Sequence, residues 1–179
     1  MGVTVRAIVV AAIAALQSAT ASVTPPGRTQ VLVFVASDCP ISNAYAPEIQ
    51  RICRDYAGRG VRCALVYEDP GITTEAVRAH LAEYGYGGID TRIDRAGTIA
   101  RSVGATVTPE AIVVDPSGTI RYRGRIDNFY AALGRPRQQV TAHDLRDALD
   151  AVLSGRTVER PRTTAVGCYI ASGQPGRKQ

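Results

Sequence analysis

Apolar and polar residues follow two patterns along the first half of the chain, one typical of buried strands and one of helices. The run VLVFVA at 31–36 is continuous and rich in β-branched residues, which indicates a central strand covered on both faces, and VRCALVYED at 61–69 predicts a second buried strand. Between them, from about Asn43, apolar residues recur at helical spacing. Pro47 falls inside that helix and predicts a kink.

The second half continues this alternation and then changes character. The expected elements are a helix capped by Thr73 or Thr74, a strand near 91–94 and a helix near 98–103. Residues 110–126 (EAIVVDPSGTIRYRGRI) predict two strands joined by an Asp-Pro-Ser-Gly turn. Thr141 and Asp144 form an acidic variant of a capping box at the start of the last helix. This order of elements predicts an α/β sandwich with a mixed sheet.

The first 21 residues have the features of a secretory signal peptide. Arg6 is followed by the apolar run 7–16 and then by Ala-Thr-Ala at 19–21, which matches a cleavage site. The apolar run is about half the ~20 residues that a membrane-spanning helix needs, so we predict a cleaved signal, with an uncleaved anchor as the alternative. The expected location of the protein is the periplasm or another extracytoplasmic compartment.

The rest of the chain predicts a short linker (22–30), one domain (31–155) and a tail (156–179) that carries Cys168. The formal net charge is +5, and the basic residues are scattered among acidic ones. Arg121, Arg123 and Arg125 are the exception, because they alternate along one predicted strand and share one face. That face is either solvated or a patch for an acidic ligand, and the charge pattern does not favour nucleic acid binding.

Cys39 lies in SDCPISN, where the first strand stops and the first helix begins. The unpaired N–H groups at a helix N-terminus favour a thiolate, so we predict that Cys39 is an activated nucleophile. Pro40 suits the first helical turn because it has no N–H to leave unsatisfied. Ser42 occupies the position of the second cysteine in a C-x-x-C pair. Its hydroxyl can donate a hydrogen bond to the thiolate, but it cannot attack a mixed disulfide.

The other three cysteines have different expected environments. Cys53 lies on the apolar stripe of the first helix and Cys63 on the second strand, so both are predicted to be buried. Three alternatives remain open for them: a structural disulfide, two core thiols or a functional role. An oxidising compartment permits the disulfide. Cys168 either staples the tail to the domain or supplies the thiol that position 42 lacks. His80 and His143 are expected at the surface or as cap partners.

These motifs carry a resemblance to a known family. VLVFVASDCPISNAYAPEI resembles the first strand, active-site loop and kinked helix of the thioredoxin superfamily, and VTPEAIVVD resembles its Thr-Pro segment. The second likeness implies that Thr108 and Pro109 form a cis-proline segment that faces Cys39. The long stretch between Cys39 and Pro109 is similar to the redoxin and alkyl-hydroperoxide-reductase branch. DCPISN together with VGC at 166–168 resembles exported bacterial redoxin-domain proteins.

The resemblance implies a thioredoxin-like sandwich, with a mixed central sheet flanked by helices and an additional helix and strand before the cis-proline. It also implies a thiol-disulfide oxidoreductase with Cys39 as nucleophile and with protein or small-molecule thiols and disulfides as partners. No cofactor is expected. Because position 42 is not cysteine, we predict that Cys168 resolves the Cys39 mixed disulfide.

Two alternatives use the same cysteine. The first is a peroxiredoxin-like peroxidase, although Ala36 stands where peroxiredoxins usually have threonine or serine. The second is a metallochaperone, since copper-delivering chaperones share this fold. Its Cu(I) site would use Cys39, Cys168 and His143.

Overall fold

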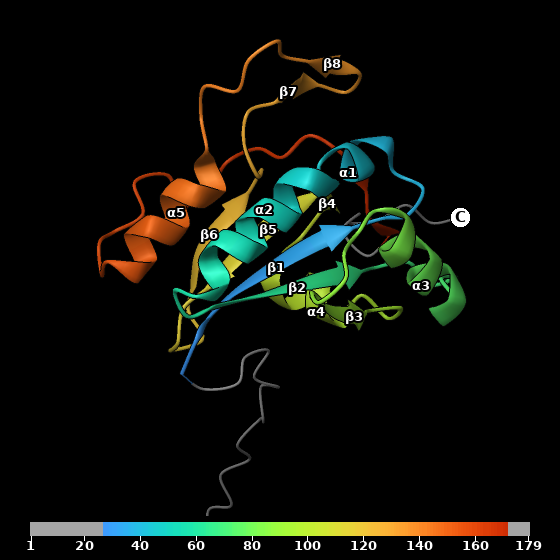
Figure 1. Ribbon diagram of the computed structural model, residues 1–179, viewed down its shortest axis with the longest axis horizontal. Coiled ribbons are helices and arrows are strands. Elements are labelled where there is room, and N and C mark those ends of the chain that lie inside the picture. The colour runs from blue at the N-terminus through green and yellow to red at the C-terminus, as the bar shows by residue number, and fades with distance from the viewer. Residues whose placement is uncertain (1–26, 172–179) are drawn as a thin grey trace, which may run out of the picture.

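A five-stranded mixed sheet forms the centre of the protein (Figure 1). The computed structural model describes residues 27–171, so the predicted signal peptide lies outside the described residues. The strands are β1 (Thr29–Val35), β2 (Val61–Tyr67), β3 (Asp90–Ile93), β4 (Val107–Thr108), β5 (Glu110–Val114), β6 (Ile120–Gly124), β7 (Tyr130–Ala132), β8 (Arg135–Pro136) and β9 (Cys168–Tyr169). The helices are α1 (Pro40–Ala44), α2 (Ala46–Ala57), α3 (Thr74–Glu83), α4 (Thr98–Val103) and α5 (Asp144–Leu153).

The strand order in the central sheet is β3-β2-β1-β5-β6. β1 pairs in parallel with β2, and β2 with β3, whereas β5 is antiparallel to β1 and to β6. The expected mixed sheet is therefore confirmed. β1 begins at Thr29, inside the predicted linker. α3, β3 and α4 lie between the Cys39 and Pro109 segments, where the sequence predicts an additional helix and strand.

β1 is buried along its whole length because both faces of the sheet are covered. Successive side chains of a strand point to opposite faces. Val31, Val33 and Val35 accordingly pack in the core that α2 and α5 cover. Leu32 and Phe34 pack on the other face, with residues of α4. Figure 1 shows α2 and α5 on the near side of the sheet and α4 behind it.

The predicted kink at Pro47 is a break between two helices. α1 ends at Ala44, Tyr45 caps it, and α2 starts at Ala46 with Pro47 in its first turn. A proline has no N–H to donate and disfavours helical geometry in the residue before it, so it is tolerated in a first turn and not in a helix interior. The sequence pattern alone does not show this interruption.

The predicted capping box at the start of α5 is wrong. His143 occupies the N-cap position without a side-chain hydrogen bond, and the Thr141 hydroxyl instead accepts from the Asn128 side-chain amide at 2.8 Å. Asp144 is buried and pairs with Arg125 at 2.7 Å and with Arg160 at 3.0 Å. The carboxylate therefore ties α5 to β6 and to the tail.

The three alternating arginines each lie near a carboxylate of the protein. Arg125 pairs with Asp144 at 2.7 Å, Arg123 lies 3.8 Å from Glu110, and Arg121 lies 3.9 Å from Asp115. Internal ion pairs thus explain these side chains without an acidic ligand.

The tail after α5 runs along the free edge of β6. The Arg123 N–H donates to the Pro161 carbonyl at 2.9 Å, and the Thr163 N–H donates to the Arg123 carbonyl at 3.1 Å. The chain then pairs through β9 with β4, and Ile170 enters the core on the α4 face. The tail therefore extends the fold from the edge of the sheet to the region of α1 (Figure 1).

A second small hairpin, β7–β8, projects beyond the central sheet at the top of Figure 1. The sequence pattern does not predict it, because its strands are short and largely exposed. Within residues 27–171, no helix has the length and apolar character needed to cross a membrane.

Candidate active site

Cys39 occupies the N-cap position of α1, directly after the β1 loop. Its backbone N–H donates to the Ala36 carbonyl at 3.3 Å, and Pro40 follows as the first residue of the helix. The residue is only 1% exposed. Its thiol donates to the Thr108 carbonyl at 3.3 Å, across 69 positions of sequence. The local sequence places the sulfur at the helix start, as predicted, and the tertiary fold covers it.

The Thr108–Pro109 segment lies against Cys39. The peptide bond between these two residues is cis, in agreement with the expectation from the resemblance. Thr108 is 1% exposed and ends β4. Its hydroxyl is buried without a hydrogen-bond partner among the described residues, and its carbonyl faces the Cys39 thiol.

Cys168 completes this group from the other end of the chain. It stands opposite Thr108 in the antiparallel β4–β9 pair, and the Ile170 N–H extends the pairing to the Thr106 carbonyl at 3.1 Å. Both Cys39 and Cys168 are free thiols, the first buried and the second half-buried. The described structure thus brings together Cys39, Thr108, Pro109 and Cys168.

Gly167 makes this approach of the tail possible. A Cβ atom at this position would collide with the carbonyl oxygen of Thr108 and would lie 2.6 Å from its carbonyl carbon. Only glycine lacks that atom, so the backbone of the tail can pack directly on the cis-proline segment.

The Cys168 thiol is held in its protonated form. Burial raises its pKa to about 12, and the hydrogen bond with Cys39 and the charges of Cys39 and Asp38 act in the same direction. Desolvation disfavours a thiolate, and a nearby negative charge does so as well. Cys168 is therefore a poor nucleophile while its thiol stays protonated, because the thiolate is the reactive form.

Ser42 has a different contact from the predicted one. It is fully buried, and its hydroxyl oxygen accepts a hydrogen bond from the Ala36 N–H at 3.3 Å. No hydrogen bond joins Ser42 to the Cys39 sulfur in the part of the chain that the structure describes. The side chain holds the loop that carries the cysteine.

His80 is buried, so the prediction of a surface position is wrong. Its two ring nitrogens lie 2.7 Å from the Tyr67 hydroxyl and 2.9 Å from the Asn43 side-chain oxygen. The Asn43 amide in turn donates to the Ser37 carbonyl at 3.0 Å. Because Asn43 presents an acceptor to the ring, Nε2 of His80 carries a proton and Nδ1 accepts from Tyr67.

This network joins α3 and β2 to the active-site loop. Burial lowers the pKa of His80, against a smaller upward effect from the charge of Glu83. The neutral ring satisfies both of its hydrogen bonds, and it packs against Tyr84 with ring centroids 4.7 Å apart. His80 therefore positions the loop through Asn43 without touching the sulfur.

Cys53 and Cys63 form a disulfide between α2 and β2, with their Cα atoms 5.6 Å apart. The sequence leaves open a structural disulfide, two core thiols or a functional role for these cysteines, and the structure shows the disulfide. Neither is therefore available to resolve Cys39.

The copper alternative finds no support in the geometry. Across residues 27–171, no group of three or more His, Cys, Asp or Glu side chains is arranged to hold a metal ion. His143 is exposed at the N-cap of α5 and does not join Cys39 and Cys168 in such a group.

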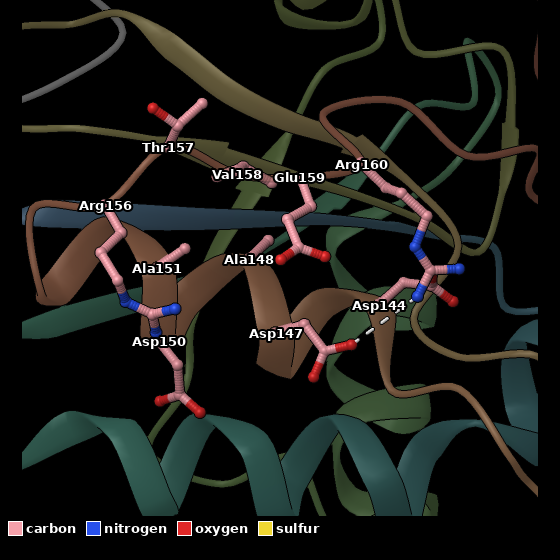
Figure 2. Close-up of a pocket in the computed structure, with 10 residues that line it drawn as sticks. All are labelled: Asp144, Asp147, Ala148, Asp150, Ala151, Arg156, Thr157, Val158, Glu159 and Arg160. Carbon is pink, nitrogen blue, oxygen red and sulfur yellow. Dashed lines mark ion pairs between the residues drawn. The ribbon is translucent and has the colours of Figure 1, made fainter.

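A cavity of about 290 Å³ lies between α5 and the tail, away from any cysteine (Figure 2). Carboxylates of α5 and of the tail line it together with Arg156 and Arg160. Arg160 pairs with Asp144 at 3.0 Å and lies 3.8 Å from Asp147. These ion pairs dock the tail on α5, at the beginning of its path to the thiol group.

A cysteine at a helix start that faces a cis-proline segment, on a mixed sheet covered on both faces, defines a thioredoxin-like protein. Residues 3–129 match the redoxin family, and this range includes Cys39 and Pro109 but ends before Cys168. The chain belongs to the redoxin family. No curated protein matches the chain.

Solved structures show the same fold. A hypothetical protein of Sinorhizobium meliloti is 30% identical, with 79% of this chain and 78% of that chain covered and a TM-score of 0.68. An uncharacterized conserved protein of Geobacillus kaustophilus is 25% identical, with 85% and 79% covered and a TM-score of 0.71. A secreted disulfide oxidoreductase of Mycobacterium tuberculosis is 16% identical, with 73% and 83% covered and a TM-score of 0.50, and it shows the fold alone.

Proposed function

We propose that this protein is an exported thiol-disulfide oxidoreductase in which Cys39 is the nucleophile and Cys168 is the resolving thiol. One observation carries the proposal. The tail places Cys168 opposite Thr108, whose carbonyl accepts the hydrogen bond of the Cys39 thiol. The thiol that position 42 lacks would thereby come from the tail, 129 residues after Cys39.

The first step is exchange with a substrate disulfide R–S–S–R′. The Cys39 thiolate attacks one sulfur, a Cys39–S–S–R bond forms, and R′–S⁻ leaves and takes up a proton. Cys39 is 1% exposed and Cys168 of β9 lies beside it, so substrate access is proposed to need the separation of β9 from β4. That pairing covers two residues of each strand, which makes it a weak ladder compared with the central sheet.

The second step returns the tail to its place. The Cys168 sulfur attacks the Cys39 sulfur of the mixed disulfide, and its proton passes to the departing R–S⁻. A Cys39–Cys168 disulfide remains, and two electrons have moved from the protein to the substrate. The same steps in reverse oxidise a substrate dithiol. The raised pKa of Cys168 keeps it protonated until Cys39 presents an adjacent sulfur.

Two features support an extracytoplasmic setting. The first 21 residues have the pattern of a secretory signal, and the Cys53–Cys63 disulfide belongs to an oxidising compartment. The partners that fit the site are protein or small-molecule thiols and disulfides.

A stoichiometric exchange assay tests the proposal. The protein, with Cys39 and Cys168 as thiols and the Cys53–Cys63 bond intact, is mixed with a disulfide-containing peptide, and products are followed by mass spectrometry. Wild type is expected to reduce one peptide disulfide per chain, Cys168→Ser to stop at the Cys39 mixed disulfide, and Cys39→Ser to leave the peptide unchanged. Reduction by Cys39→Ser at the wild-type rate would contradict the assignment. Peroxide consumption at ordinary enzymatic rates would favour the peroxidase alternative instead.

A further inference from the structure

The Cys53–Cys63 disulfide lies in the wall of a second cavity, separate from the Cys39 site. This cavity has a volume of about 530 Å³, within the range of small-molecule sites. It opens where α2, β2 and the loop before β3 meet. Cys53 is 8% exposed, and Cys63 is half-buried. A small molecule in the cavity therefore contacts a disulfide.

The rim of this cavity is basic. Arg28, Arg54 and Arg62 line it, all three are exposed, and none forms an ion pair among residues 27–171. Asp90 is the one carboxylate among the described lining residues. Three cations against one anion leave a positive charge at the rim of the cavity, in contrast to the ion-paired cavity beside α5.

Two of these arginines are chain neighbours of the disulfide. Arg54 follows Cys53 on α2. Arg62 precedes Cys63 on β2, where consecutive side chains point to opposite faces, so its charge acts from the rim of the cavity. A positive charge attracts an incoming anionic thiolate and stabilises the thiolate that departs, and both effects speed thiol-disulfide exchange. The positive rim and the partial exposure of Cys63 therefore both favour reaction of this disulfide with an anionic thiolate.

We propose that this cavity is a second redox site, which binds a small thiol that carries carboxylate or sulfonate groups. The thiolate R–S⁻ attacks the sulfur of the more exposed residue, Cys63, and forms R–S–S–Cys63 while Cys53 leaves as a thiolate and takes up a proton. A second R–S⁻ attacks the reagent sulfur of that mixed disulfide, which releases R–S–S–R and leaves Cys63 reduced. The thiol is oxidised and the protein gains two electrons, independently of Cys39 and Cys168.

Charge-selective reduction kinetics test the proposal. The oxidised protein reacts with mercaptoethanesulfonate, mercaptoethanol or cysteamine at equal thiolate concentration, and peptide mapping follows the Cys53–Cys63 bond. We expect the anionic reagent to be about tenfold faster than the neutral one at low ionic strength, and the cationic one to be slowest. A mixed disulfide on Cys63 is the expected intermediate. Equal rates for the three reagents, or cleavage only after unfolding, would overturn the proposal.

Matched variants separate the effect of the arginine charges from the effect of access to the disulfide. The preference for the anionic reagent is expected to vanish in Arg54→Gln/Arg62→Gln and at high salt, and to persist in Arg101→Gln, which removes an exposed arginine on α4, across the sheet. The salt dependence keeps the test valid if the double variant does not fold. The experiment is repeated in Cys39→Ser/Cys168→Ser, where the preference must remain. Its loss there would show that the reduction passes through the Cys39 site.

Discussion

The backbone of Gly167 packs directly on the carbonyl of Thr108, with no room for a Cβ atom between them. This contact holds the tail on the cis-proline segment, and Cys168 is the next residue. It makes a residue near the end of the chain part of the environment of Cys39. The position of the Cys168 thiol thus depends on one glycine.

Gly167→Ala is expected to loosen the tail. The added methyl group must displace the backbone, and overpacking of this kind costs about 1–3 kcal/mol. Because Cys168 of β9 lies beside the buried Cys39, we also expect faster iodoacetamide labelling of Cys39 in the folded, reduced variant. Gly58→Ala is the control, since a Cβ atom at Gly58 meets nothing within 4 Å. Unchanged labelling of Cys39 in Gly167→Ala would contradict the covering role of the tail.

His80→Leu is expected to destabilise the protein and to slow thiol exchange. It removes the partner of the Tyr67 hydroxyl and of the Asn43 side chain, at about 1–3 kcal/mol for each buried group left unsatisfied. His143→Leu removes the other histidine, which is exposed, and should change the free energy of unfolding by no more than about 0.5 kcal/mol. Urea unfolding measures the free energy of unfolding of the two variants. Equal stabilities of the two variants would refute the buried network.

Arg125→Leu is expected to cost about 1.5–3 kcal/mol of stability, because it removes a charge-assisted hydrogen bond to the buried Asp144 carboxylate. Arg121→Leu, within β6, has a contact of 3.9 Å to Asp115 and should cost less than about 1 kcal/mol. Thermal unfolding at neutral pH compares them. A loss of stability of the same size in both variants would show that the Arg125–Asp144 ion pair contributes no more than the Arg121–Asp115 contact.

The rate at which a thiol reagent labels Cys168 should rise over a higher pH range than the labelling rate of a free thiol. Its pKa of about 12 means that the thiolate fraction at pH 8 is at least about a hundredfold below that of a free thiol, whose pKa is ~8.5. In the folded, reduced protein we therefore expect the labelling rate to rise about tenfold per pH unit from pH 8 to at least about 10. The unfolded chain should level off above pH ~9. A plateau near pH 9 in the folded protein would contradict the raised pKa.

Local patterns were sufficient for much of the fold. The strand at 31–36 is predicted because a fully buried strand needs a continuous apolar run, and α4 matches its predicted range of 98–103. The position of Cys39 at a helix start and the cis bond before Pro109 also follow from short motifs. Each of these features depends on residues close together in sequence.

Contacts between segments that are distant in the chain leave weaker signals in the sequence than local patterns do. The tail is held along β6 by backbone hydrogen bonds, such as that from Arg123 to Pro161, which no side-chain pattern reveals. His80 is buried because Tyr67, Tyr84 and Tyr86 surround it, although its position within α3 is compatible with exposure. The sequence predicts Cys168 either as a tail staple or as the second thiol for Cys39, but its register against Thr108 required the structure.

The most direct test of the account is disulfide mapping of the oxidised protein. Wild type is oxidised in air without reductant, free thiols are blocked, and peptides are analysed without reduction. We expect one peptide pair joined through Cys39 and Cys168, beside the Cys53–Cys63 pair, and an unchanged Cys53–Cys63 pair in Cys168→Ser. Recovery of Cys168 in alkylated form, or joined to Cys53 or Cys63, would contradict it.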